Sequence, residues 1–129
     1  MFKKITLILF FILSFSSLSA EIINKVNING NTRVSDETII IYGKIELNKN
    51  YTESDLNIML KDLYSTEFFS DIKIDIKNKE LNINIKEYPY VNQLVIVGEK
   101  TKNNINQIKK IIKLKEKRSF IDSYISEDV

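Results

Sequence analysis

The chain contains neither cysteine nor histidine among its 129 residues. Without cysteine there is no disulfide framework and no thiol that could carry a lipid anchor. The two absences together remove the usual general base, the thiol nucleophile and most transition-metal ligands. We therefore predict that the chain is not an enzyme and holds neither a metal nor a cofactor.

Glycine is scarce, and an excess of one charge is lacking. The chain has three glycines, and they form no run that could cradle a phosphate. Once Lys3 and Lys4 at the N-terminus are set aside, 17 basic residues face 17 acidic ones. This balance argues against a nucleic-acid partner. The basic residues after Tyr90 all lie between Lys100 and Arg118, which favours a solvated helix face over a lipid or phosphate site.

One stretch is strongly hydrophobic, and it lies near the N-terminus. A mostly apolar run of eleven residues, Ile5 to Phe15, follows Lys3 and Lys4 and precedes small residues up to Ala20. These three zones predict a secretory signal peptide at 1–20. An uncleaved membrane anchor is the alternative, but eleven residues fall short of the roughly 20 that cross a bilayer.

Two segments of the remaining chain follow the same plan. Ile23 to Gly30 and Val91 to Gly98 both carry apolar residues at matching distances before the glycine, and the two glycines are 68 residues apart. This period predicts a tandem array of small domains, with a first domain at 21–89 and a second at 90–129.

The first domain contains two helix signals. Ser35 can cap a helix that ends near Gly43, and Thr52 with Asp55 forms a capping box for a second helix. Behind this box, apolar residues recur at the spacing of one helical face, which predicts a core stripe. Its members are Leu56, Met59, Leu60, Leu63 and Tyr64.

The pattern then changes to strict alternation. Ile72 to Ile76 and Leu81 to Ile85 alternate with polar residues, and Asn78-Lys79 between them predicts a tight turn. The domain is therefore α+β, with the order β-α-α-β-β and two helices covering a three-stranded mixed sheet.

The second domain begins in the same way and does not finish. We expect a strand at Val91–Val97, a helix through Ile105 to Ile112, and a new helix start near Ser126. Both closing strands are absent, so the sequence predicts a truncated second copy.

Three stretches carry a resemblance to a known family: Ile28–Ser35, Leu63–Ile72 and the exit Lys86–Pro89. They resemble the polypeptide-transport-associated (POTRA) domains at the N-terminus of BamA, the bacterial outer-membrane protein assembly factor. The family often has glycine where Glu67 stands here.

The resemblance implies a periplasmic module, exported by a signal peptide to the periplasmic face of the outer membrane. Such a module would receive unfolded outer-membrane β-barrel proteins, dock accessory lipoproteins, and precede a membrane barrel that this sequence lacks. The alternatives are the POTRA module of a two-partner secretion transporter and an inner-membrane-anchored cell-division protein.

A sheet edge is the candidate binding site. If the exit strand is central, the strand before it has unpaired N–H and C=O groups that can accept an extended client by β-augmentation. The alternative is that this strand is an ordinary edge whose charged residues guard against pairing. If the strand does accept a client, the client-binding residues are Asp71, Ile72, Lys73, Ile74, Asp75, Ile76 and Lys77.

Overall fold

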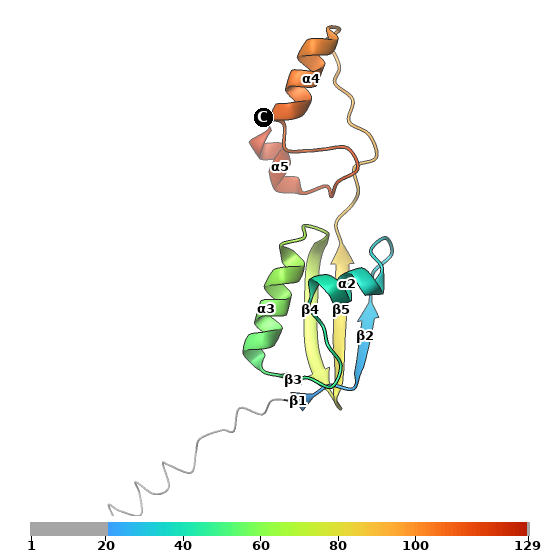
Figure 1. Cartoon of the computed structure of the whole chain (residues 1–129). Coiled ribbons are helices and arrows are strands. Elements are labelled where there is room, and N and C mark those ends of the chain that lie inside the picture. The colour runs from blue at the N-terminus through green and yellow to red at the C-terminus, as the bar shows by residue number, and fades with distance from the viewer. Residues whose placement is uncertain (1–20, 129) are drawn as a thin grey trace, which may run out of the picture.

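The first unit of the chain is a three-stranded sheet with two helices on one face (Figure 1). The computed structural model describes residues 21–128, so the predicted signal peptide at 1–20 lies outside the described residues. β2 (Lys25–Asn29) runs parallel to β5 (Glu80–Glu87), and β4 (Phe69–Lys77) runs antiparallel to β5. The strand order β2-β5-β4 places the exit strand in the centre. The predicted α+β fold with a mixed sheet is confirmed.

Side-chain caps fix where both helices start. α2 (Asp36–Tyr42) begins after Ser35, whose hydroxyl accepts the Thr38 N–H at 3.3 Å. α3 (Glu53–Tyr64) begins with the predicted capping box, in which Thr52 Oγ1 accepts the Asp55 N–H and Asp55 Oδ2 accepts the Thr52 N–H. These bonds occupy donors that the first helical turn leaves unpaired.

The hairpin turns where the alternation of the sequence breaks. Asn78 and Lys79 both have positive φ, 54° and 64°, and the flanking residues Lys77 and Glu80 face each other in the ladder. Two consecutive positive φ angles define a tight turn whose twist matches that of the strands.

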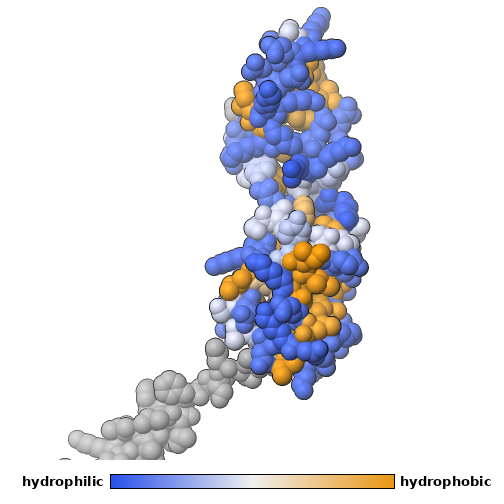
Figure 2. Space-filling model, viewed as in Figure 1, coloured by the Kyte–Doolittle hydropathy of each residue, from blue (hydrophilic) through white to orange (hydrophobic). Residues whose placement is uncertain are grey.

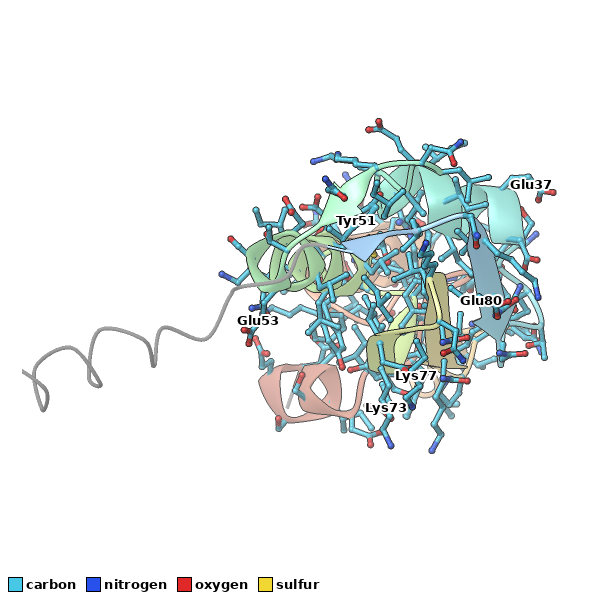
Figure 3. All side chains as sticks on the ribbon, turned by 90° about the horizontal axis from the view of Figure 1, so that it is seen from below. Glu37, Tyr51, Glu53, Lys73, Lys77 and Glu80 are labelled. Carbon is cyan, nitrogen blue, oxygen red and sulfur yellow. The ribbon has the colours of Figure 1, made fainter. Side chains whose placement is uncertain are left out.

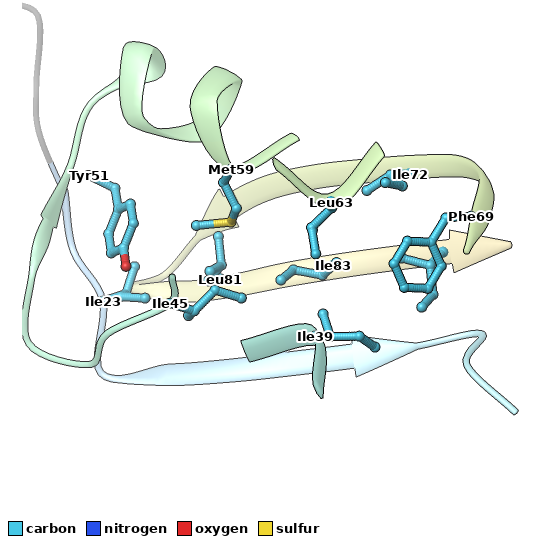
Figure 4. Packing of buried hydrophobic residues seen from close by; sticks show 11 residues of the cluster. Ile23, Ile39, Ile45, Tyr51, Met59, Leu63, Phe69, Ile72, Leu81 and Ile83 are labelled. Atoms are coloured by element: carbon cyan, nitrogen blue, oxygen red, sulfur yellow. The ribbon is translucent and has the colours of Figure 1, made fainter. Parts of the chain in front are cut away.

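The core lies between the sheet and the helices (Figure 4). Met59 and Leu63 of the predicted stripe are buried, but Tyr64 is 40% exposed, so its assignment to the core is wrong. Tyr64 is the last residue of α3 and lies where the helix reaches the sheet margin. A second small sheet, β1 (Glu21–Ile22) with β3 (Asn50–Tyr51), was not predicted. The buried residues are Ile23, Ile39, Ile45, Tyr51, Met59, Leu63, Phe69, Ile72, Leu81, Ile83 and Ile85.

The second unit contains helices and loops (Figure 1). α4 (Lys102–Ile111) confirms the predicted helix, and none of its residues is buried. Residues 91–97 are not a strand, which corrects the prediction for this segment. The physical reason is that no described strand lies beside them to pair with. The chain pairs here at a bridge between Tyr90 and Ser119, where the Val91 N–H donates to the Arg118 carbonyl at 2.9 Å and the Val91 carbonyl accepts the Lys117 N–H at 2.7 Å.

The last helix also differs from the prediction. α5 (Asp122–Glu127) begins before Ser126 and ends where a helix was expected to start. The acidic residues that suggested a first turn have another role: the Asp128 carboxylate accepts the N–H groups of Lys113 and Leu114. Within residues 21–128 no helix is long and apolar enough to cross a membrane.

Candidate functional site

The seven predicted site residues, 71–77, all lie in β4, at the margin of the sheet. β4 pairs with β5 on one side and with no other strand of the described chain on the other. β2 is the opposite margin, which sequence reasoning did not single out as an edge. It has five residues against nine in β4, so β4 is the longer of the two edges.

The turn geometry decides which backbone groups of β4 point outward. Lys77 and Glu80 close a two-residue turn, so they form a hydrogen-bonded pair of the antiparallel ladder. Bonded and non-bonded positions alternate along such a ladder. Asp75 and Lys73 therefore bond to β5, whereas the N–H and C=O groups of Ile76, Ile74 and Ile72 face away from it. Consistent with this, the Ile72 N–H donates outward to the hydroxyl of Tyr64 at 3.1 Å.

The side chains of β4 divide between the two faces of the sheet. Ile72 is buried on the helix face, and Ile74 and Ile76 are half-buried against the core. Lys73 and Lys77 project from the face away from α2 (Figure 3). Lys77 Nζ lies 3.0 Å from Asp75 Oδ2, so the charge on this open face is largely balanced. An added strand would meet apolar side chains on one face and charged groups on the other.

Both helices leave apolar side chains at the surface of this unit. Ile41 of α2 is 72% exposed and Ile58 of α3 is 53% exposed. Figure 2 shows apolar side chains gathered over the unit that carries α2, whereas the second unit is mostly hydrophilic on the same side.

A half-buried residue, Glu87, ties the first unit to the junction with the second. Glu87, whose side chain is 6% exposed, accepts the N–H groups of Thr32, Arg33 and Val34 at 2.9–3.0 Å. Burial raises the pKa of Glu87, but the N–H groups of Val34, Thr32 and Arg33 outweigh burial and bring that pKa to about 2. Arg33 also donates to the Tyr88 carbonyl at 2.7 Å. The sequence did not reveal this cluster, because Glu87 lies more than 50 residues after the loop Thr32–Val34 that it contacts. Both segments belong to the stretches that carry the family resemblance.

The predicted basic helix face continues beyond the helix: Lys113, Lys115, Lys117 and Arg118 lie after α4 and line a cleft of about 450 Å³ between the two units, so the prediction of a helix face is wrong for these four residues. Several of its cations already have internal partners: Lys113 pairs with Glu127, and Lys115 Nζ donates to the carbonyls that end α4. Across the cleft, the Tyr124 hydroxyl donates to Glu67 at 2.7 Å. This hydrogen bond links the two units at the cleft.

The described residues contain no group of three acidic residues placed to hold a metal ion. What β4 offers chemically is its backbone: a row of donors and acceptors beside a half-buried apolar strip. Such an edge can pair with an extended polypeptide of many sequences.

The comparison with protein families matches residues 21–88 to the POTRA family, described as a surface antigen variable number repeat. The chain belongs to the POTRA family. The match covers the strands and helices of the first unit, from β1 to β5, and confirms the resemblance identified from the sequence. Glu67, at the position where POTRA domains often have glycine, has a φ of 58°, so the left-handed turn is kept without glycine.

Curated relatives of this POTRA chain carry one name, outer membrane protein assembly factor BamA. The protein from Neorickettsia risticii is 28% identical over 81 residues, which are 63% of this chain and 11% of the relative. The protein from Neisseria meningitidis serogroup B is 27% identical over 82 residues, which are 64% of this chain and 10% of the relative. The chain thus spans about a tenth of the length of these relatives.

Solved structures share the POTRA fold at low identity. The N-terminal domain of Omp85 from Thermosynechococcus elongatus has a TM-score of 0.59 and 14% identity, covering 86% of this chain and 48% of that one. POTRA domains 1–2 of the periplasmic domain of Omp85 from Anabaena give a TM-score of 0.57 and 10% identity, covering 87% of this chain and 75% of that one. At these identities the likeness is one of fold.

Proposed function

We propose that this chain is a periplasmic POTRA module of the machinery that assembles outer-membrane β-barrel proteins. It receives unfolded barrel proteins and docks accessory lipoproteins of the assembly complex by β-augmentation at β4. In this proposal a signal peptide exports the chain, and it works at the periplasmic face of the outer membrane ahead of a membrane barrel.

The free edge of β4 carries the proposal. Three consecutive outward positions, Ile72, Ile74 and Ile76, present backbone groups over a stretch of five residues. Backbone pairing does not depend on the client's side chains, and this suits a module that handles many different barrel strands. The charges of Lys73 and Lys77 lie on the open face and not across the edge, so they do not cover it.

The names of the relatives support assembly over the alternatives. Both curated relatives are named outer membrane protein assembly factors. A two-partner secretion transporter or an anchored division protein would also carry a POTRA domain. A transporter module would take a different client, which the passenger experiment below tests. An anchored division protein would keep the N-terminal segment, so a mature chain that still begins at Met1 would favour it.

We also propose that residues 90–128 are the opening part of a second POTRA domain. Gly30 and Gly98 have matching φ angles of 91° and 96°. A Cβ on Gly30 would lie 2.0 Å from the Ile85 carbonyl oxygen, so Gly30 lets β5 pass closely. A Cβ on Gly98 would meet nothing within 4 Å. The backbone of Gly98 thus has the conformation that a neighbouring central strand requires, without that strand beside it.

The experiment for the main proposal places a photo-crosslinker at Lys77 of the full chain and adds a urea-denatured outer-membrane β-barrel protein upon dilution. Ile74→Pro removes one outward donor and puts a proline ring at the docking edge, while the bonds from β4 to β5 remain. We expect crosslinking to fall roughly tenfold, since a lost ladder bond and the steric conflict act together. Unchanged crosslinking by a folded Ile74→Pro variant would reject augmentation at β4.

Two further variants make the result specific. Ile74→Val keeps the N–H and most of the side chain, and it should crosslink like the parent. Lys73→Pro removes a donor that points toward β5. It should therefore lower the free energy of unfolding of the domain itself, because it breaks a bond within the sheet and not one to the client. A passenger protein of a two-partner secretion system, added in place of the barrel protein, should crosslink poorly; efficient crosslinking of that passenger would favour the transporter alternative.

A further inference from the structure

The docking edge of β4 is already occupied at one point. Tyr64, the last residue of α3, lies over the margin of the sheet and accepts the outward N–H of Ile72 through its hydroxyl at 3.1 Å. A strand added to β4 would place a carbonyl oxygen at that same position. The Tyr64 hydroxyl thus stands where the partner strand would have its acceptor.

The remaining outward groups define a shorter edge. No described residue donates to or accepts from the outward groups of Ile74 and Ile76 through a side chain, and the strand ends at Lys77. The Ile72 carbonyl also points outward, because N–H and C=O of one residue face the same side in an antiparallel ladder. The free edge therefore runs from the carbonyl of Ile72 to Ile76.

The same side of α3 contributes apolar surface along this edge. Leu60 lies one helical turn before Tyr64, so both side chains are on the face that meets β4. Leu60 and Ile74 are half-buried against the core. A strand lying beside β4 would bury more of both if its own side chains on this face were apolar.

We propose that Tyr64 is a specificity-determining residue that limits the docking edge to the stretch from the Ile72 carbonyl to Ile76. The edge then selects a short extended segment with alternating apolar and polar residues, whose apolar side chains face α3. This inference rests on the proposed function, because it assigns a limit to the same edge. Removing the hydroxyl frees the Ile72 N–H and lengthens the edge by one hydrogen bond.

The test uses two synthetic peptides of alternating valine and lysine, with four and nine residues, titrated onto the ¹⁵N-labelled full chain. Only the nine-residue peptide is long enough to reach Ile72 while pairing with Ile76, because these two positions span five residues of β4. In Tyr64→Phe we expect its affinity to rise roughly two- to tenfold, which corresponds to one additional net backbone hydrogen bond. The affinity of the four-residue peptide should be unchanged.

A matched control comes from α2. Tyr42 is 49% exposed, and its hydroxyl bonds to no other described residue. Tyr42→Phe should alter the affinity of neither peptide. Equal affinity of the nine-residue peptide for the parent and for a folded Tyr64→Phe variant would overturn the inference.

Hydrogen exchange gives a second test that needs no variant. In the parent chain, exchange of the Ile72 amide should be the same with either peptide, because Tyr64 holds that amide throughout. Added protection by the nine-residue peptide would mean that the strand displaces Tyr64, and the limit would not exist. If neither peptide perturbs the amides of Ile74 and Ile76, the proposed function fails as well, whereas binding that is insensitive to Tyr64 leaves it intact.

Discussion

Replacing Glu87 by glutamine should weaken the first domain by an amount that depends on pH. The carboxylate accepts N–H groups from Thr32, Arg33 and Val34, and its side chain is 6% exposed. Glutamine has the shape of a protonated glutamate, so Glu87→Gln removes the charge and keeps the volume. The variant therefore measures what the negative charge contributes at this position.

The size of the expected loss in the free energy of unfolding follows from the pKa of Glu87. A fall from 4.5 to about 2 corresponds to about 3 kcal/mol of stabilisation of the charged form in the folded state. Because the folded pKa is the lower one, this contribution is present in full above about pH 5. It is lost as the pH falls through 4.5 toward 2, where both states become protonated. The difference between parent and variant should be about 3 kcal/mol at pH 7 and about 1 kcal/mol at pH 3.

Urea unfolding followed by circular dichroism at both pH values gives this difference. Glu46→Gln is the matched control, since Glu46 is 67% exposed and pairs loosely with Lys49 at 3.4 Å. We expect the control to change the free energy of unfolding by less than about 0.5 kcal/mol at either pH. A Glu87→Gln effect of equal size at pH 7 and pH 3 would refute the reasoning, because packing and not charge would then be responsible.

Two further predictions concern the stability of the fold. Gly30→Ala should lower the free energy of unfolding by about 3 kcal/mol, since its Cβ would meet the Ile85 carbonyl, whereas Gly98→Ala should cost about 1 kcal/mol from its positive φ alone. Urea titration of both variants measures the contrast, and equal losses would contradict the role given to the Ile85 carbonyl. Leu63→Ala should cost about 2–5 kcal/mol because Leu63 is fully buried, and Ile41→Ala should cost little because Ile41 is 72% exposed. Thermal unfolding measures the second contrast, and similar melting temperatures for Leu63→Ala and Ile41→Ala would count against the core described above.

The elements set by short-range signals could be predicted from the sequence. The Thr52 and Asp55 capping box and the turn at Asn78-Lys79 depend on residues within four positions of each other, and both are confirmed. The exit strand β5 is central, so the condition for an open edge at β4 is met. Local chemistry thus determined most of the first domain.

The features that the sequence did not predict depend on contacts between residues far apart in the chain, or on a neighbouring strand that is absent from the described residues. Glu87 meets the loop at Thr32 only after the parallel pairing of β2 with β5 has formed. Tyr64 fits the helical stripe, yet a hydroxyl at the end of a helix needs a polar partner, and that need was the available signal for its position. Residues 91–97 have a strand pattern, but a strand also requires a neighbour.

The central place of β5 has a mechanical consequence. β2, near the start of the domain, and β5, at its exit, are adjacent and parallel over five residue pairs. A force that pulls the N-terminal side of the domain away from the unit after Pro89 slides these two strands along each other. The hydrogen bonds between the two strands are then loaded in shear, so they bear the force together and do not break one after another. The sheet is therefore arranged to resist tension applied between the start and the exit of the domain.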